Sequence, residues 1–194
     1  LLDKALLAKG VSPVEALYGD NTDGQGLINH IKRLGWPLNG ARVAIIGAGG
    51  AARGVVLPLI EAGIETLTIA NRTVSKAEIL VDELSTASEK INQHTIQTHA
   101  TAALSGDFDI IINATSIGLS GETLPLADAL NCQYAYDMMY GRELPFLQHF
   151  STFGAQTSDG YGMLIGQAVL SFERWTGRAI DVAQATTALE NVST

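Results

Sequence analysis

The chain has 194 residues, and its 12 Lys and Arg residues against 20 Asp and Glu residues give a formal net charge of −8 at pH 7. This excess of acid argues against a surface that holds nucleic acid or an anionic membrane by charge. Apolar residues make up 46% of the chain, enough for a sizeable core, and no apolar run approaches the roughly 20 residues of a membrane span.

Hydrophobic periodicity predicts strands and helices that alternate along the chain. Residues 1–17 indicate a short helix and a turn, and Asp23 is a candidate cap for a helix with one apolar stripe that extends to Leu34. Further helices are predicted at 50–62, 74–84, 145–153, 163–175 and 180–189. Strands are predicted at 43–46, 66–70, 94–99, 109–113, 134–137 and 155–157. The alternation implies an α/β fold with a doubly wound, mainly parallel sheet (Rossmann-like) and helices on both faces.

A glycine-rich turn joins the first predicted strand to the helix that follows it. The segment Gly47-Ala48-Gly49-Gly50-Ala51-Ala52 has the G-x-G-x-x-A spacing of a dinucleotide-binding turn. Gly47 allows the tight turn, Gly49 lets the backbone approach a pyrophosphate, and Ala52 permits close packing of helix on strand. Free N–H groups at the helix start favour phosphate there. Because both flanking elements are present, the motif predicts dinucleotide binding; the alternative is a glycine turn that merely packs.

The end of the second strand indicates which dinucleotide. An acidic residue that holds a ribose 2′-hydroxyl is expected about 20 residues after the glycine turn. Asn71-Arg72-Thr73 stands there instead, with Lys76 one helical turn later. Arg72 can pair with a 2′-phosphate and stack beside adenine, while Asn71 and Thr73 can donate hydrogen bonds. Two cations at a helix N-terminus oppose its dipole unless an anion binds, so the pattern favours NADP over NAD.

Three more polar segments stand at strand ends or at a helix start. Thr115 and Ser116 lie in the loop after the fourth strand, at the edge where ligands bind in open α/β sheets. Met138 and Tyr140 follow the fifth strand, where Met138 can cover a nicotinamide face and the Tyr140 hydroxyl can reach a substrate. The alternatives are hydroxyls that cap their own loop and residues that simply pack. The segment Asp20-Asn21-Thr22-Asp23-Gly24 has the composition of a turn and helix cap.

Taken together, these segments resemble those of the shikimate dehydrogenase family. Six motifs match in order from about Gly19 to the C-terminus, which makes the resemblance specific. It implies an NADPH-dependent reduction of 3-dehydroshikimate to shikimate, in the pathway to aromatic amino acids. The matching segments are Gly19-Asp20-Asn21-Thr22-Asp23-Gly24, Gly47-Ala48-Gly49-Gly50-Ala51, Asn71-Arg72-Thr73, Asn113-Ala114-Thr115-Ser116, Tyr136-Asp137-Met138 and Asp159-Gly160-Tyr161-Gly162-Met163-Leu164, with Gln167 in the same register.

The resemblance also implies roles for particular residues. Asp23 matches the aspartate of the family's catalytic Lys–Asp dyad, which contacts a ring hydroxyl and orients the lysine. Tyr140 and Gln167 match residues that hydrogen-bond the substrate. The residues assigned to the cofactor site are Gly47, Ala48, Gly49, Gly50, Ala51, Asn71, Arg72, Thr73, Lys76, Thr115 and Ser116, with Met138, Gly160 and Met163 around the nicotinamide.

The family's substrate domain has no match in the residues before Gly19. In the family this domain supplies the catalytic lysine, a serine pair for the substrate carboxylate and an asparagine, and neither Lys4 nor Lys9 takes the lysine's role. We therefore expect a truncated form that binds NADP without efficient turnover. The expected divisions are an atypical N-terminal segment at 1–18, an NADP-binding Rossmann-like domain at 19–159, and helices at 160–194 that pack on the substrate domain in the family.

Two other functions remain open. A non-catalytic NADP-binding module is consistent with the unmatched lysine, whereas Asp23, Tyr140 and Gln167 favour catalytic ancestry. The other is a quinate/shikimate dehydrogenase of broader specificity, a group that tends to accept NAD through an acidic residue after the second strand. This sequence has Asn71-Arg72-Thr73 at that place, which disfavours this function.

The expected partner is a small-molecule substrate, 3-dehydroshikimate or shikimate, with neither nucleic acid nor membrane. Apolar surface on the helices at 24–34 and 163–175 favours a homodimer or other self-association. The lone Cys132 and the four histidines show no metal-ligand spacing, so no metal site is expected. A single cysteine also indicates a reducing, cytoplasmic setting.

Overall fold

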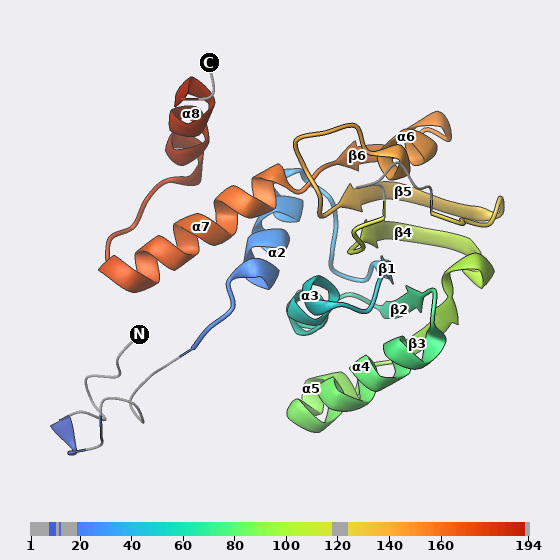
Figure 1. Ribbon diagram of the computed structural model, residues 1–194, viewed down its shortest axis with the longest axis horizontal. Helices are drawn as coiled ribbons and strands as arrows, with labels where there is room; N and C mark the ends of the chain where they lie inside the picture. Colours follow the sequence, from blue (N-terminus) through green and yellow to red (C-terminus); the bar gives the residue numbers. More distant parts are fainter. Residues whose placement is uncertain (1–7, 11, 13–18, 118–123, 193–194) are drawn as a thin grey trace.

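The structure is a computed structural model that describes residues 8–10, 12, 19–117 and 124–192 (Figure 1). The helix expected at 1–17, together with Lys4, falls mostly outside these ranges. Six strands form one sheet in the order β3-β2-β1-β4-β5-β6, and every neighbouring pair is parallel. This order confirms the doubly wound, Rossmann-like sheet. The strands are β1 Arg42–Ile46, β2 Thr66–Asn71, β3 Ile96–Ala100, β4 Gly106–Asn113, β5 Leu130–Asp137 and β6 Gln156–Ser158.

The helices follow the predicted order, with differences at their ends. The helix expected at 74–84 continues to Ala87, and a short helix that was not predicted follows it. The N-cap of the first described long helix is Thr22 and not Asp23, which is the first helical residue. The Asp23 N–H donates instead to Oδ1 of Asn21, at 2.8 Å. The helices are α2 Asp23–Arg33, α3 Gly50–Glu61, α4 Val74–Ala87, α5 Glu89–Asn92, α6 Pro145–Thr152, α7 Tyr161–Thr176 and α8 Val182–Val192, with a 3₁₀ turn η1 Thr101–Ala103.

Each strand of the sheet's centre is buried on both faces, which confirms the prediction of helices on both sides. Val43 and Ile45 of β1 join a core cluster with side chains of α2, α3 and α4. Ala44 and Ile46 of the same strand face the opposite way and join a cluster with side chains of α6. Alternate residues of a strand point to opposite faces, so a continuous apolar run fits such a strand.

The helices α2 and α7 cross where both carry glycine, although they lie far apart in the sequence (Figure 1). A Cβ on Gly26 would lie 2.9 Å from both the Cβ and the backbone nitrogen of Gln167. A Cβ on Gly166 would lie 3.4 Å from the carbonyl oxygen of Gly26. The backbones therefore approach closely at this crossing, and a larger side chain at position 26 would push α7 away.

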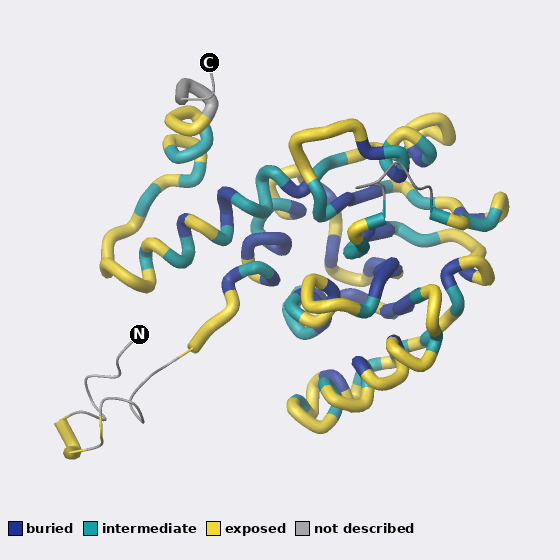
Figure 2. The backbone as a smooth tube through the Cα atoms, viewed as in Figure 1, coloured by how far each residue is buried: buried dark blue, intermediate teal, exposed yellow. Residues whose placement is uncertain are grey.

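The apolar surface on these two helices differs from the expectation. The stripe of α2 is buried within this chain, since Leu27 and Ile31 are 0% exposed. Toward the end of α7, Phe172 is 36% and Trp175 is 73% exposed. Figure 2 shows exposed backbone at this end of the helix. In the described part of the chain, none of the helices has the length and apolarity needed to cross a bilayer.

Candidate functional site

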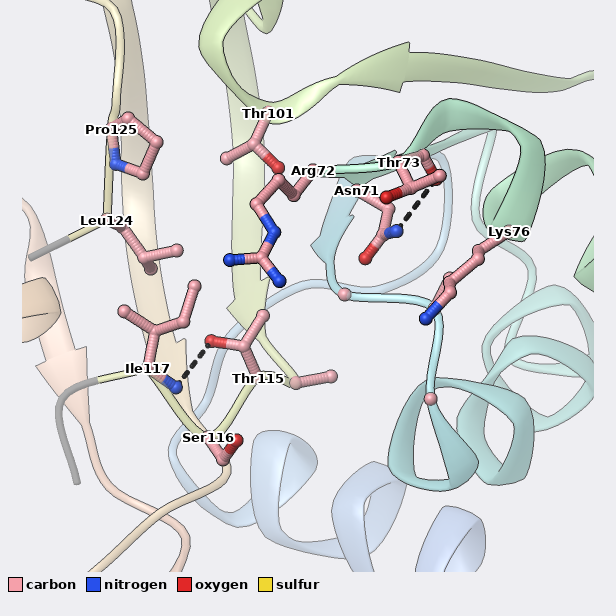
Figure 3. Close-up of a pocket in the computed structure, with 14 residues that line it drawn as sticks. Asn71, Arg72, Thr73, Lys76, Thr101, Thr115, Ser116, Ile117, Leu124 and Pro125 are labelled. Carbon is pink, nitrogen blue, oxygen red and sulfur yellow. Dashed lines mark hydrogen bonds between the residues drawn. The ribbon is translucent and has the colours of Figure 1, made fainter. Parts of the chain in front are cut away.

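A cavity of about 510 Å³ lies at the carboxyl ends of the parallel strands (Figure 3). The strand order reverses there, between β1 and β4, which is where ligands bind in open α/β sheets. Its walls come from the turn after β1, the residues after β2, the start of η1 and the loop after β4. Of the predicted cofactor residues, it is lined by Gly47, Ala48, Gly49, Asn71, Arg72, Thr73, Lys76, Thr115 and Ser116.

The glycine turn after β1 lines one wall of this cavity. Its backbone adopts a conformation that residues other than glycine avoid. Gly47 has φ +115° and donates its N–H to the carbonyl of Ala70, at 2.7 Å. A Cβ at this position would lie 2.9 Å from the carbonyl oxygen of Ala114. Gly49 is the N-cap of α3 and has no atom within 4 Å of the position that a Cβ would take. The first N–H groups of α3 therefore have open space in front of them, where an anion is favoured.

The residues after β2 bring two cations to the same cavity. Arg72 and Lys76 are both exposed, and their side chains extend into the cavity (Figure 3). Among the described residues neither forms an ion pair, and the first turn of α4 holds no acidic residue. The Asn71 side chain donates to the carbonyl of Thr73, at 2.8 Å, which fixes the turn that presents Arg72. These free positive charges suit a phosphate group.

A buried pair of polar residues holds the loop after β4, and its role was missed in the sequence. Asn113 and Asp137 end adjacent strands and are each 0% exposed. Asn113 Nδ2 donates to Asp137 Oδ2 at 2.9 Å, while Asn113 Oδ1 accepts from the hydroxyl of Thr115 at 2.7 Å. Burial raises the pKa of the Asp137 carboxyl, and hydrogen bonds from Asn113 and from the Met139 N–H oppose that rise. The buried pair therefore fixes the position of Thr115 at the cavity.

Five other residues line the cavity without having been predicted. Ala114 lies within a matching segment but was given no role, and no spacing marks the other four, because their place follows from the pairing of strands and the course of loops. Thr101 was detectable only by its position just after β3, the strand paired with β2. The five are Thr101, Ala114, Ile117, Leu124 and Pro125.

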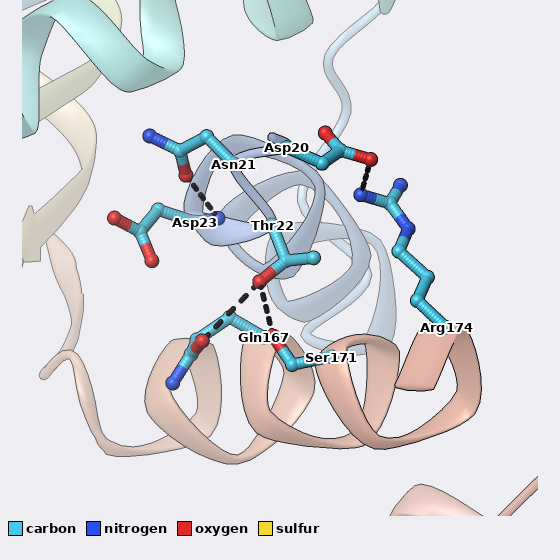
Figure 4. Close-up of polar contacts among 7 residues, drawn as sticks. All are labelled: Asp20, Asn21, Thr22, Asp23, Gln167, Ser171 and Arg174. Atoms are coloured by element: carbon cyan, nitrogen blue, oxygen red, sulfur yellow. Dashed lines mark hydrogen bonds and ion pairs between the residues drawn. The ribbon is translucent and has the colours of Figure 1, made fainter. Parts of the chain in front are cut away.

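A second polar cluster joins the start of α2 to α7, and it contains two of the predicted functional residues (Figure 4). The Thr22 hydroxyl lies 3.2 Å from Oε1 of Gln167 and 2.9 Å from the hydroxyl of Ser171. Asp20 pairs with Arg174 further along α7. The Asp23 carboxylate is half-buried, points away from Arg174 and makes no hydrogen bond or ion pair to another described residue. It is therefore available to a ligand.

The remaining predicted residues lie outside the cavity lining. Gly50 and Ala51 are exposed in the first turn of α3. The Gly160 N–H donates to the carbonyl of Met139 at 2.9 Å, which ties the start of α7 to the loop after β5. The Tyr140 side chain is 43% exposed, and its ring centre lies 6.2 Å from that of Tyr161. Half-buried Met138 and Met163 pack against the core cluster under α2 and α3.

Among the described residues, no group of three or more His, Cys, Asp and Glu side chains is placed to hold a metal ion. The half-buried Cys132 is a free thiol, and burial raises its pKa to about 12. It is therefore a poor nucleophile at neutral pH.

Two family models match this chain. Residues 30–120 match the model described as shikimate / quinate 5-dehydrogenase, and residues 160–190 match that of the shikimate 5'-dehydrogenase C-terminal domain. A shikimate dehydrogenase (NADP(+)) of Psychrobacter cryohalolentis is 93% identical over 194 residues, which cover all of this chain and 67% of the relative.

Solved structures agree with these matches. A shikimate 5-dehydrogenase from Thermus thermophilus in complex with shikimate is 30% identical with a TM-score of 0.70, and the match covers 89% of this chain and 61% of that one. A shikimate dehydrogenase in complex with NADP⁺ is 32% identical with a TM-score of 0.72, covering 91% and 63%. The chain thus spans about two thirds of the length of its curated relatives and somewhat less of these solved chains.

Proposed function

The chain belongs to the shikimate dehydrogenase family, and we propose that it is the NADP(H)-binding part of an oxidoreductase that reduces 3-dehydroshikimate to shikimate. Aromatic amino-acid biosynthesis is the pathway that this reaction serves. The proposal is carried by two cations, Arg72 and Lys76, which have no ion-pair partner among the described residues and line a cavity next to the start of α3.

The residues of the cavity fit each charged part of NADP(H). The N–H groups at the start of α3, next to Gly47 and Gly49, suit the pyrophosphate. Arg72 and Lys76 suit the 2′-phosphate, with hydrogen bonds from Asn71 and Thr73. No carboxylate stands among these lining residues to hold a 2′-hydroxyl or repel a phosphate. The cofactor of this site is accordingly NADP(H) in preference to NAD(H).

The nicotinamide end of the cofactor is assigned by family resemblance and by position. Gly160 lies against the backbone of Met138 where the loop after β5 touches the start of α7, and Met163 follows in the first turn of that helix. When bound, the nicotinamide supplies a hydride to the substrate carbonyl. These residues hold its ring in place, and the loop that carries Thr115 and Ser116 supports the adjoining part of the cofactor.

Asp23 is the proposed catalytic residue of this chain, and Gln167 and Tyr140 are the proposed substrate contacts. The free carboxylate of Asp23 can accept a hydrogen bond from a ring hydroxyl of the substrate and orient a neighbouring lysine. A hydride added to a ketone leaves an alkoxide, which needs a proton donor beside it. No described residue near Asp23 matches the family's lysine, so the 194-residue polypeptide is proposed to bind the cofactor without efficient turnover.

The domain divisions belong to this proposal. Residues 19–159 form the NADP-binding domain, and residues 160–194 are the helices that pack on the substrate domain in the family. The exposed Phe172 and Trp175 of α7 support an apolar contact there, either with that domain or with a second copy of the chain. A cytoplasmic location completes the proposal, and the lone free cysteine supports it.

A comparison of NADPH with NADH tests the proposal. In isothermal titration calorimetry, the 194-residue chain is expected to bind NADPH at least about tenfold more tightly than NADH, because a charge-assisted contact contributes about 1.5–3 kcal/mol. Equal affinities would contradict the assignment of Arg72 and Lys76, and absence of binding to either dinucleotide would contradict the proposed function itself.

A further inference from the structure

Thr101 is a buried residue whose side chain faces the cofactor cavity, and nothing in the sequence motifs gives it a role. The residue is only 4% exposed, and it lines the cavity. Its hydroxyl takes part in none of the hydrogen bonds among the described residues, although its carbonyl accepts the N–H of Leu104 at 3.3 Å. Because Thr101 lines the cavity and its hydroxyl is not engaged by the described residues, a ligand in the cavity can hydrogen-bond to it and gain affinity.

The pairing of β2 and β3 sets Thr101 beside Arg72. The two strands are parallel, with Asn71 opposite Ala100. The residues that directly follow these strands are Arg72 and Thr101, and they therefore leave the sheet side by side. Figure 3 shows the two side chains next to each other at one end of the cavity.

The cavity has a different character on the two sides of the Arg72 guanidinium (Figure 3). Asn71, Thr73 and Lys76 lie on one side, and they offer donors and positive charge to a phosphate. The other side is walled by the apolar residues Ile117, Leu124 and Pro125. A purine ring needs apolar walls and a flat cation to stack on, and the guanidinium offers that face.

From this arrangement we propose that the Thr101 hydroxyl hydrogen-bonds the edge of the adenine ring and so selects the base of the cofactor. The inference rests on the proposed NADP(H) function and deepens it. A hydroxyl both donates and accepts, so it can donate to N1 or accept from the exocyclic amino group, which share one edge of adenine. Thr101 thereby contributes to binding of the base, while Arg72 and Lys76 contribute to binding of the 2′-phosphate.

The variant Thr101→Val tests this proposal because valine keeps the volume of threonine and removes only the hydroxyl. Loss of one hydrogen bond is expected to raise the Kd of NADPH about threefold to tenfold in calorimetry. The Kd of NADH is expected to rise by the same factor, since both cofactors carry adenine. Thr101→Ser keeps the hydroxyl and restores the wild-type Kd. Thr98→Val, at a half-buried threonine of β3 outside the cavity lining, is the matched control and leaves both values unchanged.

Four results would overturn the proposal. The first is a Thr101→Val variant whose Kd for NADPH lies within twofold of the wild-type value. The second is a Thr101→Val variant that loses affinity for NADPH but not for NADH. The third is a Thr101→Ser variant that binds NADPH as weakly as Thr101→Val does. The fourth is unequal binding of wild type and Thr101→Val to 1,N⁶-etheno-NADP⁺, in which N1 and the exocyclic nitrogen are blocked, because it would put the hydroxyl on another part of the cofactor. Thr101→Ala supplies a second hydroxyl-free variant if Thr101→Val does not fold. A wild-type chain that binds no NADPH contradicts the proposed function instead.

Discussion

The amide of Asn113 donates a hydrogen bond of 2.9 Å to the carboxylate of Asp137, and both side chains are fully buried at the ends of adjacent strands. The same two residues hold the loops that follow them, through Thr115 on one side and the Met139 N–H on the other. One buried pair therefore positions both the cavity loop and the loop that carries Met138.

The buried carboxyl of Asp137 predicts a pH dependence of stability. Its pKa is raised in the folded chain by burial, so the folded state binds the proton more tightly than the unfolded state does. Asp137 therefore makes the folded state less stable as the pH rises from about 4, its unfolded pKa, through the raised folded value. We expect the free energy of unfolding of the wild type minus that of Asp137→Asn to fall over this window. Urea unfolding of both proteins at several pH values measures it, and a difference that is constant or rises with pH would contradict the prediction.

Arg72→Gln is predicted to weaken NADPH binding by about tenfold or more, since a charge-assisted hydrogen bond contributes about 1.5–3 kcal/mol. NADH lacks the 2′-phosphate and keeps only the adenine that stacks on the guanidinium, so its affinity should fall much less than that of NADPH. Calorimetry with both cofactors measures the effect. Arg178→Gln removes an exposed cation after α7 and serves as the control. A variant that loses affinity for both cofactors equally would show that Arg72 acts on the shared part of the ligand.

The glycines of the turn before α3 have separable roles. Gly47→Ala is predicted to reduce the free energy of unfolding by about 1–3 kcal/mol, because φ is +115° and the added Cβ meets the Ala114 carbonyl. Gly49→Ala places its Cβ in open space at a φ of −94° and should leave stability nearly unchanged. Its methyl group would, however, occupy the approach to the start of α3 and weaken NADPH binding. Urea unfolding and calorimetry on both variants distinguish the roles, and equal stability of the two would argue against strain at Gly47.

Thr22→Val is predicted to destabilise the junction of α2 and α7. It removes the hydroxyl that bonds Gln167 and Ser171, and it leaves both partners facing a methyl group in a buried site. The expected loss is about 1–2 kcal/mol in the free energy of unfolding. Thr22→Ser, which keeps the hydroxyl, is the control for urea unfolding. An unchanged midpoint in Thr22→Val would mean that water replaces these contacts at no cost.

The 194-residue polypeptide is predicted to show negligible reduction of 3-dehydroshikimate while NADPH binds. An alkoxide that forms beside Asp23 is repelled by an ionised carboxylate and requires a proton donor. Steady-state NADPH oxidation with 3-dehydroshikimate measures the activity, with calorimetry as the check that the cofactor is bound. Rapid turnover would show that another group, such as Lys9, provides the proton.

The sequence predicted those parts of the site whose signals are local. The spacing of Gly47 and Gly49, and the cations at 72 and 76, lie within a few residues of a predicted strand end, and the structure places them in one cavity. Thr101 and the buried pair Asn113–Asp137 depend on which strands are neighbours and in which register. That information resides in contacts between distant segments, so periodicity could not supply it.

The ends of the strands were also hard to predict from local sequence patterns. Burial patterns predicted the fourth and fifth strands only where they are buried, at 109–113 and 134–137. In the structure the ladder between them begins at Gly106 and Leu130, where several residues reach solvent. Backbone hydrogen bonds continue there without an apolar pattern to reveal them. The stripe on α2 was expected at the surface because the family packs this helix on its substrate domain, whereas in the structure Leu27 and Ile31 pack with side chains of α3 and the sheet.

The crossing of α2 and α7 at Gly26 has a consequence for the order in which the chain folds. The bonds from Thr22 to Gln167 and Ser171 join residues 145 and 149 positions apart, so they close a loop that contains the entire sheet. Such distant contacts form slowly, because the loop-closure entropy is lost before the contact stabilises anything. During synthesis α2 leaves the ribosome long before α7 exists. Until α7 is made, the face of α2 that carries Thr22 and Gly26 has no partner helix, and in this interval the nascent chain is exposed to chaperones and to aggregation.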